Sequence, residues 1–340
     1  MLTFCSPAQT AHAPLRELHN GGWMDHAETP ARLETIRAAL GPAALRAPAD
    51  HGLAPILAVH DADYVAFLES AHAEWRAAGR EGDAIPYTFP VRGRRPLALE
   101  RIDAKLGRFS YDAATPVAAG TWGAAYAGAQ AALSALEAVA GGEAKRAFAL
   151  CRPPGHHAGA DYFGGYCYLN NAAIAARAAA ARGLGPVAVL DVDYHHGNGT
   201  QDIFWEDGGV FFASIHADPA TDYPYYWGHA DERGAGDGEG ATMNLPLPRG
   251  TTWAGYKGAL GTALEAVAAF GARTLIVSYG ADTFAEDPIS HFALTTDDMN
   301  RIGAAVATLG LPTVTVMEGG YDVAALGRNV AAFLAGLEGA

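Results

Sequence analysis

The segment from Asp191 to Asn198 constrains this chain more than any other part of its sequence. The run Val187-Ala-Val-Leu190 before it is short and wholly apolar, which predicts a strand buried on both faces, as in a parallel sheet. Alternate side chains of an extended segment share a face, so Asp191, Asp193 and His195 can point the same way. Burying two carboxylates and an imidazole without a cation would be costly. The segment therefore predicts a divalent metal site where a buried strand ends.

From residue 120 onward, apolar runs that predict strands alternate with longer runs that predict helices. The predicted strands span 147–150, 187–190, 210–213, 274–277 and 313–317. The predicted helices span 121–140, 170–182, 253–270 and 296–309, and a last one begins near 323. This rhythm predicts an α/β fold with a mostly parallel sheet and helices on both faces. Since no internal repeat or clear linker divides the chain, we expect a single domain over 1–340.

Polar residues follow each of the five predicted strands. In open parallel sheets, ligands bind beyond the carboxyl ends of the strands, so we expect these residues to meet at one rim. The segments are Cys151–His157, Asp191–His195, Ser214–His216, Ser278–Asp282 and Glu318–Tyr321.

Three of these rim residues are predicted metal ligands: Asp193, His195 and Asp282. Three protein ligands leave a position open for water, as catalysis by a bound metal requires. Asp191 is expected to orient its neighbours from behind the ligands. Oxygens around Asp191, Asp193, His195 and Ser214 could also hold a monovalent cation.

The adjacent histidines His156 and His157 follow a stiff Pro-Pro-Gly turn. They could serve as general base and general acid beside a metal-activated water. Each needs a polar partner to set its tautomer, and Asp191 and Asn198 are available. Tyr321 follows two glycines, a position that suits a donor to a developing oxyanion, although simple packing at the rim would also explain it.

Aromatic residues and glycines predict a narrow entrance. Gly165 could offer a backbone carbonyl beside Tyr166, and Tyr223 begins the aromatic run Tyr223–Trp227. Such aromatic pairs can grip an aliphatic chain or a cation, although core packing would explain any one of them equally well.

Composition limits the partners and the compartment. The net charge is −14 over 340 residues, which disfavours nucleic acid and would suit a cationic substrate, although it also simply favours solubility. No apolar run is long enough to span a bilayer. Three cysteines without a CxxC pair predict a reducing, cytoplasmic setting.

The segment 76–118 stands apart because it is rich in Gly, Pro and basic residues. A connection of this length is usually functional or mobile, so a lid or a subunit contact and a solvated loop are both compatible with it. Its basic residues are Arg92, Arg94, Arg95, Arg101, Lys105 and Arg108.

Four motifs together resemble the arginase/histone-deacetylase superfamily, and within it the bacterial acetylpolyamine amidohydrolases. They are Arg152–His157, Asp191–Gly197, Gly280–Phe284 and Glu318–Tyr321. A looser likeness covers nearly the whole chain, including the insert at about 76–118. The resemblance implies the arginase-deacetylase fold and a zinc-dependent deacetylase of small N-acetylated amines, with Fe²⁺ or Co²⁺ as other metals that the ligands allow.

The resemblance also assigns roles to single residues. It implies that Asp193, His195 and Asp282 bind zinc, that His157 of the tandem pair is the general base, and that Tyr321 polarises the carbonyl. It places an acidic group for a distal ammonium at Glu17, and a homodimer contact in the insert. The implied structural potassium site comprises Asp191, Asp193, His195, Ser214 and Ile215.

The chain departs from the family pattern at two positions. Ala114 stands at an expected acidic position of the insert, although Glu100 and Asp103 remain, and Asn198 replaces the aspartate of many lysine deacetylases. Deacetylation of acetyl-lysine in proteins or of another small amide therefore stays open, as does binding of an acylated ligand without turnover. A ureohydrolase would need a second metal, for which the sequence offers few ligands near His156.

Overall fold

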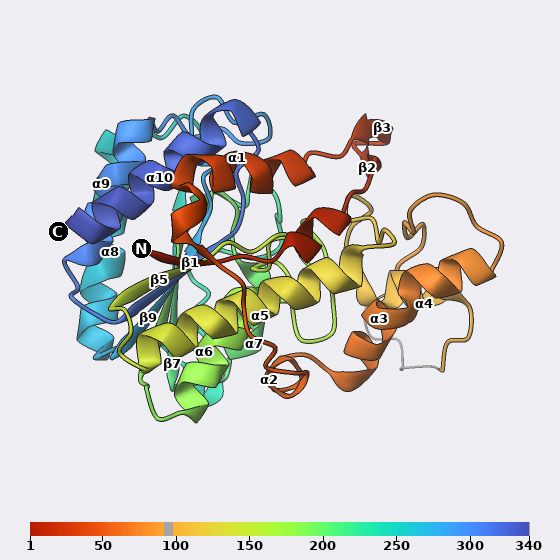
Figure 1. The fold of residues 1–340 in the computed structure, drawn as a ribbon, viewed down its shortest axis with the longest axis horizontal. Helices are drawn as coiled ribbons and strands as arrows, with labels where there is room; N and C mark the ends of the chain where they lie inside the picture. The colour runs from red at the N-terminus through yellow and green to blue at the C-terminus, as the bar shows by residue number, and fades with distance from the viewer. Residues whose placement is uncertain (92–97, 340) are drawn as a thin grey trace.

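The computed structural model describes residues 1–91 and 98–339 and is built around one eight-stranded parallel sheet (Figure 1). Arg92, Arg94 and Arg95 of the predicted basic cluster lie outside the described residues. The strand order is β4-β1-β5-β10-β9-β6-β7-β8. The strands are β1 (Leu2–Phe4), β4 (Leu45–Arg46), β5 (Arg146–Ala149), β6 (Val187–Asp191), β7 (Val210–Ala217), β8 (Thr242–Leu247), β9 (Thr274–Tyr279) and β10 (Thr313–Met317).

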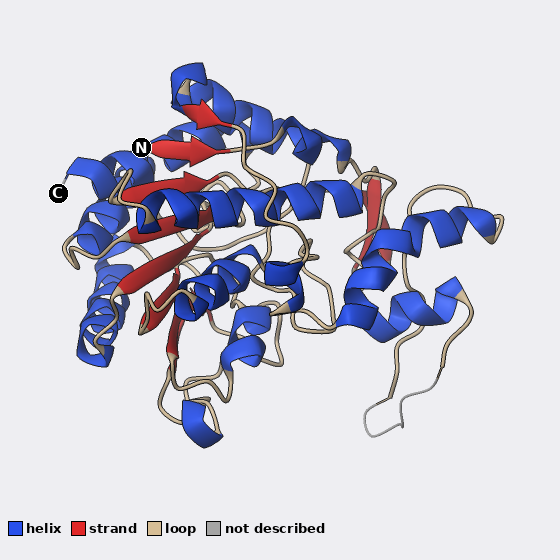
Figure 2. Ribbon diagram, turned by 60° about the horizontal axis from the view of Figure 1, so that its bottom comes forward, coloured by secondary structure: helices blue, strands red, loops and turns tan. Residues whose placement is uncertain are grey.

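The continuous apolar runs form central strands because both faces of the sheet are covered. In β5, Ala147 and Ala149 face one hydrophobic core, whereas Phe148 faces the other. In β6, Val189 and Leu190 divide in the same way. Figure 2 shows the strands lying between helices on both sides. All five predicted strands are present, and β7 extends four residues beyond its predicted end.

The helices form two layers. The first layer contains α5 (Thr121–Ala140) and α6 (Asn171–Ala181), and the second contains α1 (Pro30–Leu40), α8 (Trp253–Phe270), α9 (Thr296–Ala307) and α10 (Val323–Gly339). Helices α9 and α10 pack so closely that a Cβ atom at Gly303 would lie 2.1 Å from the carbonyl oxygen of Phe333, and the absence of a side chain at Gly303 allows this approach. None of the described helices is long and apolar enough to cross a membrane.

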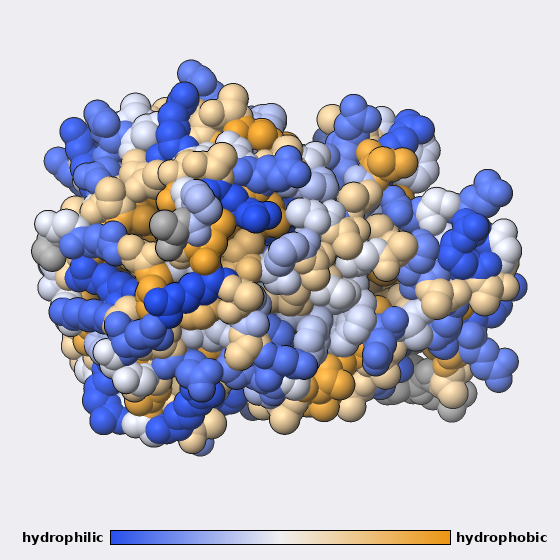
Figure 3. Space-filling model, viewed as in Figure 1, coloured by the Kyte–Doolittle hydropathy of each residue, from blue (hydrophilic) through white to orange (hydrophobic). Residues whose placement is uncertain are grey.

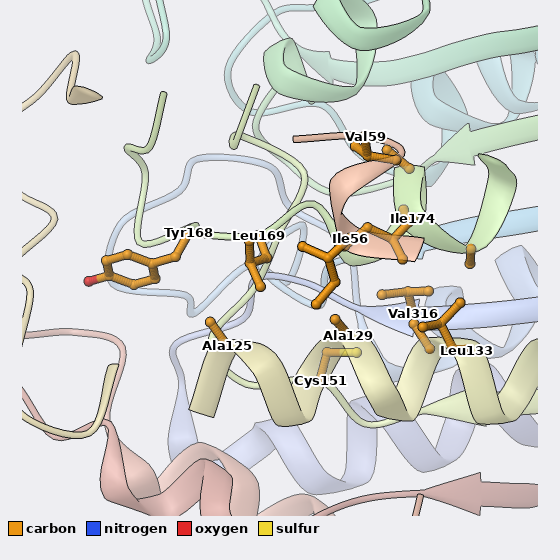
Figure 4. Close-up of a cluster of buried hydrophobic side chains, with 14 of the residues drawn as sticks. Ile56, Val59, Ala125, Ala129, Leu133, Cys151, Tyr168, Leu169, Ile174 and Val316 are labelled. Carbon is orange, nitrogen blue, oxygen red and sulfur yellow. The ribbon is translucent and has the colours of Figure 1, made fainter. Parts of the chain in front are cut away.

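The core of the first layer lies between α5 and the sheet (Figure 4). There Leu133 of α5 lies near Val316 of β10, and both side chains are fully buried. Cys151 belongs to the same cluster, and all three cysteines are free and buried. Two short helices, α2 (Ala54–Leu57) and α7 (Asn198–Phe204), also contribute residues to this core.

The segment 76–118 is not only a loop. It contains α4 (Ile102–Phe109), which buries Leu106 and Phe109 against α3 (Ala62–Ala77). Figure 1 shows α3 and α4 projecting to one side of the sheet domain. A two-stranded hairpin, β2 (Arg16–His19) with β3 (Gly22–Asp25), is a further element that the sequence did not predict.

Basic side chains of this segment are paired with acids. Arg101 donates to Asp103 at 2.7 Å, as does Arg80. Lys105 donates to Glu74 and Arg108 to Asp63, both at 2.7 Å. Asp103 is therefore occupied by two guanidinium groups.

Candidate metal and catalytic site

The site lies at the carboxyl ends of four neighbouring strands. β5, β10, β9 and β6 are adjacent in the sheet, and Asp191 at the end of β6 lies beside Ser278 of β9. The loops that follow these strands carry His156, Tyr321, Asp282 and Asp193 respectively. Four of the five segments expected at the rim therefore meet there, whereas Ser214–His216 lies within β7, where Ser214 pairs with Asp191.

Asp193, His195 and Asp282 converge at this rim. One potential ligand atom from each lies within 4.8 Å of the other two. His195 Nδ1 is 3.0 Å from Asp282 Oδ2 and 3.5 Å from Asp193 Oδ1. Burial and the neighbouring Asp193 raise the pKa of Asp282 to about 7. Two buried carboxylates this close need a proton or a cation between them, so the donor set fits a divalent metal.

The surrounding backbone holds the two carboxylates in place. Asp193 Oδ2 accepts a hydrogen bond from Gly319 N at 2.8 Å, and Asp282 Oδ1 accepts one from Tyr194 N at 2.9 Å. A Cβ atom at Gly280 would lie 1.9 Å from Asp193 Oδ2, so only glycine fits there. Asp193 Oδ1 also accepts from His195 N at 2.8 Å, so the His195 ring, Asp282 Oδ2 and the second lone pair of Asp193 Oδ1 are left for a cation.

The tandem histidines have different partners. His156 Nδ1 donates to Asp191 Oδ2 at 3.0 Å, whereas His157 Nδ1 donates to Asn198 Oδ1 at 2.7 Å. Asp191 Oδ1 accepts from Asp193 N at 3.1 Å, so Asp191 links the pair to the metal ligands. Both partners are those that the sequence offered, and both histidines are buried.

The two environments separate the pKa values of the pair. Burial would lower the pKa of His156, but the Asp193 and Asp191 carboxylates outweigh it and raise that pKa to about 10. Burial, with His156 and His195 nearby, moves the pKa of His157 well below its usual value. A neutral His157 can accept a proton at neutral pH, and a protonated His156 can donate one.

Arg32 supports Tyr321, a contact that the sequence did not reveal. The guanidinium carbon lies 4.8 Å from the centre of the Tyr321 ring. Its Nε donates to Gly320 O and its Nη2 to Glu318 O, each at 2.6 Å. Arg32 is almost 290 residues away in the sequence, and no motif connects it with this turn.

A cavity of about 580 Å³ opens onto the site. Such a volume suits a small ligand. All four predicted substrate-binding residues line it together with three rim residues: Glu17, Gly165, Tyr166, Tyr223, His157, His195 and Tyr321. Ala114 also lines it, so the expected acidic position does face the cavity.

Buried carboxylates shape the cavity wall. Asp112, which the sequence did not single out, accepts from Gly165 N at 2.7 Å and from the Tyr223 hydroxyl at 2.9 Å. Glu17 accepts from the Tyr166 hydroxyl at 3.0 Å and from His26 Nδ1 at 2.9 Å. Glu17 is only 4% exposed, so its carboxylate is held rigidly.

Two residues of the implied potassium site, Asp193 and His195, are also candidate metal ligands, and the other three lie in the neighbouring strands β6 and β7. Asp191 pairs with Ser214 across β6 and β7, and Ser214 Oγ is 2.9 Å from His216 Nδ1. Ile215 is fully buried beside them.

Two further buried clusters contain possible ligand atoms. Glu318 Oε2 accepts from Gly155 N at 2.7 Å, and Glu318 lies with His156 and Cys167. Burial raises the pKa of the Cys167 thiol well above its usual value, which makes it a poor metal ligand. The other cluster consists of His12, His26 and Glu28, three residues without a sequence signal for their proximity.

Comparison with known proteins identifies the family. A model of the histone deacetylase domain matches residues 26–337. An acetylpolyamine amidohydrolase of Pseudomonas aeruginosa is 48% identical over all of this chain and 99% of its own length. One from Mycoplana ramosa is 48% identical over 95% of each chain.

Solved structures show the same fold. The crystal structure of an acetylpolyamine aminohydrolase from Burkholderia pseudomallei matches with a TM-score of 0.94 and 44% identity, covering 99% of this chain and 98% of that one. The HDA15 HD domain matches with a TM-score of 0.82 and 26% identity, covering 100% and 91%. The chain therefore belongs to the histone deacetylase family of hydrolases and has the arginase-deacetylase fold predicted from its sequence.

Proposed function

We propose that this protein hydrolyses the amide bond of N-acetylated polyamines or similar small cationic N-acyl amines. One observation carries the proposal: the aspartate–histidine–aspartate cluster, His157 and Tyr321 meet at the base of a cavity with a buried carboxylate, Glu17, in its wall. Two relatives that match this chain over nearly their full length are named acetylpolyamine amidohydrolases, and this supports the substrate class.

The metal that we propose is Zn²⁺, held by Asp193, His195 and Asp282; Fe²⁺ or Co²⁺ would suit the same donors. A divalent cation at this position supplies Lewis-acid polarisation of the acyl carbonyl and makes a water molecule more acidic. We further propose K⁺ at the site formed by Asp191, Asp193, His195, Ser214 and Ile215.

The protein groups would then divide the proton transfers. His157, neutral and hydrogen-bonded to Asn198, takes the proton of the attacking water. Tyr321 donates a hydrogen bond to the acyl oxygen as negative charge develops on it. His156, kept protonated by the Asp193 and Asp191 carboxylates, supplies positive charge next to His157, and the protonated His157 delivers a proton to the departing amine.

Glu17 provides the proposed recognition of the substrate's distal ammonium. Each of its oxygens already accepts one hydrogen bond from the protein, and a carboxylate oxygen can accept two. Glu100 and Asp103 of the insert add little, because neither lines the cavity and Asp103 is paired with Arg80 and Arg101. Ala114, which does line it, has no charge.

The test is a matched set of substrates: N-acetylputrescine, N-acetylspermidine, an acetyl-lysine peptide and neutral N-butylacetamide. We expect the two polyamines to have the highest kcat/KM. The Glu17→Gln variant should lose about tenfold in kcat/KM for the polyamines and little for N-butylacetamide, since the negative charge is removed while the shape of the side chain is kept. A preference for the peptide would instead indicate a protein deacetylase. No turnover of any of the four would refute the proposal.

Two further parts of the proposal concern the oligomeric state of the protein and its cellular compartment. We expect a homodimer formed through the insert, where Tyr87 and Val91 are 76% and 69% exposed. Figure 3 shows that polar and apolar residues are mixed over the face viewed there. Free, buried cysteines support a cytoplasmic setting.

A further inference from the structure

The turn that carries Tyr321 is held by side chains from two directions. On one side Arg32 donates to the carbonyl oxygens of Glu318 and Gly320. On the other side a single carboxylate accepts from the backbone N–H groups. Asp287 Oδ2 is 2.6 Å from Tyr321 N and 3.4 Å from Asp322 N.

Asp287 lies in the loop that follows β9 and is only 6% exposed. Its second oxygen, Oδ1, accepts from Ile289 N at 3.1 Å, and its own N–H donates to Phe284 O at 3.1 Å. Pro288 and Ile289 line the cavity, as Tyr321 does. One buried carboxylate therefore joins the cavity wall to the turn of the tyrosine.

The turn needs such a support because of its two glycines. Gly320 has a φ of +120°, which favours glycine. Since glycine has no side chain, this residue cannot anchor the turn by packing against its surroundings. A Cβ atom at Gly319 would lie 2.4 Å from Asp282 Oδ2, so this position cannot gain an anchoring side chain. The bonds from Arg32 and Asp287 supply the rigidity that the sequence of the turn lacks.

We propose that Asp287 is a positioning residue for the reaction, acting through the backbone N–H of Tyr321. This inference rests on the proposed role of Tyr321. A donor to an oxyanion is effective only within a few tenths of an ångström of its correct position, and a displacement of about 1 Å can cost about 100-fold in rate. The bond from Asp287 fixes the Cα position from which the phenol extends.

The first test compares Asp287→Ala and Asp287→Asn with Glu286→Ala. Glu286 is the neighbouring carboxylate and is exposed, so its variant controls for lost negative charge in this loop. For Asp287→Ala we expect kcat to fall about 10- to 100-fold, with KM changed less than about threefold. Asp287→Asn should recover part of the loss, because its amide oxygen can accept from Tyr321 N. Glu286→Ala should match the wild type.

The second test is a double-mutant cycle with Tyr321→Phe. If Asp287 acts by placing the tyrosine hydroxyl, Asp287→Ala should cost less than about twofold in kcat once that hydroxyl is absent. A general loss of structure would lower kcat equally in both backgrounds and would overturn the proposal, as would an unchanged kcat in Asp287→Ala. If Asp287→Ala does not fold, the same cycle with Asp287→Asn decides between these outcomes.

The failure of this inference can be told apart from failure of the proposed function. The cycle uses whichever acylated amine of the substrate set the wild type turns over best. An active wild type with additive variants refutes the role of Asp287 alone. A wild type that hydrolyses none of the substrates refutes the proposed function, and with it the reaction on which Asp287 is proposed to act.

Discussion

Replacing Asn198 by aspartate tests the assignment of His157 as the general base. Asn198 Oδ1 accepts from His157 Nδ1 at 2.7 Å, and the substitution puts a carboxylate there with little change in shape. Asn198 Nδ2 makes only long contacts, 3.4 Å to the Tyr162 hydroxyl and 3.5 Å to His157 O. The Tyr111 hydroxyl, 3.5 Å from Asn198 Oδ1, can donate to the new carboxylate, so we expect the variant to fold.

The size of the effect follows from the charge introduced. Unit charges about 4 Å apart attract with about 4 kcal/mol at an effective dielectric constant of about 20. This energy would raise the pKa of His157 by about 3, since one pKa step corresponds to about 1.4 kcal/mol. The cost of burying the new carboxylate offsets part of that, so we expect a rise of about 1–2. A histidine with a raised pKa stays protonated up to a higher pH, and the protonated form cannot accept a proton from water.

The assay is the pH dependence of kcat/KM for N-acetylputrescine. In Asn198→Asp the acid limb should move to higher pH by about 1–2 relative to the wild type. The exposed substitution Asn300→Asp adds the same charge far from the site and should leave the limb in place. A ¹³C NMR titration of the histidines assigns the shift to His157. Coincident acid limbs in the variant and the wild type would refute the assignment.

Three further predictions concern turnover, the metal and the core. Tyr321→Phe should lower kcat by about 100- to 1000-fold while leaving Tm within about 1 °C, because the ring keeps its contact with Arg32; kinetics and thermal melts check both. Chelation of the metal should lower the free energy of unfolding more at about pH 7 than at about pH 4, since the pKa of Asp282 is raised to about 7 and its ionised form then faces Asp193 without a cation. Urea titrations of the chelated and the Zn²⁺-loaded protein give this difference, in which the contributions of distant buried histidines such as His60 cancel. Leu133→Ala should lower the free energy of unfolding by about 2–5 kcal/mol with KM unchanged, because the side chain is fully buried (Figure 4).

The central strands were predictable because each is a continuous apolar run buried on both faces. β8 was not, since Asn244 and Pro246 interrupt it; it is an edge strand, where a proline can be tolerated. β1 and β4, of three and two residues, are too short to give a pattern. Helix α4 was missed because its few apolar residues lie in a polar segment and are buried by contacts distant in the sequence, among them those with α3.

The proposed metal ligands and the histidine pair were predictable because each belongs to a segment that follows a strand, and the fold brings the ends of those strands to the rim. The supporting residues lack that property. Arg32 lies in α1 and reaches the rim only because α1 packs against α10. Asp287 accepts a hydrogen bond from a backbone N–H, and His26 donates one to a carboxylate. Neither contact requires a particular spacing of residues along the chain, so no sequence motif reveals it.

The balance of charge at the rim shows why a cation belongs to this arrangement. Asp191, Asp193, Asp282 and Glu318 are all fully buried there. The two nearby buried arginines do not neutralise them, because Arg32 and Arg152 form their ion pairs with Glu28. Only His156 and His195 remain, and a protonated His195 could not bind a metal. A divalent cation replaces the protons that Asp282 and His195 would otherwise carry, and it leaves the charge of His156 available to the reaction.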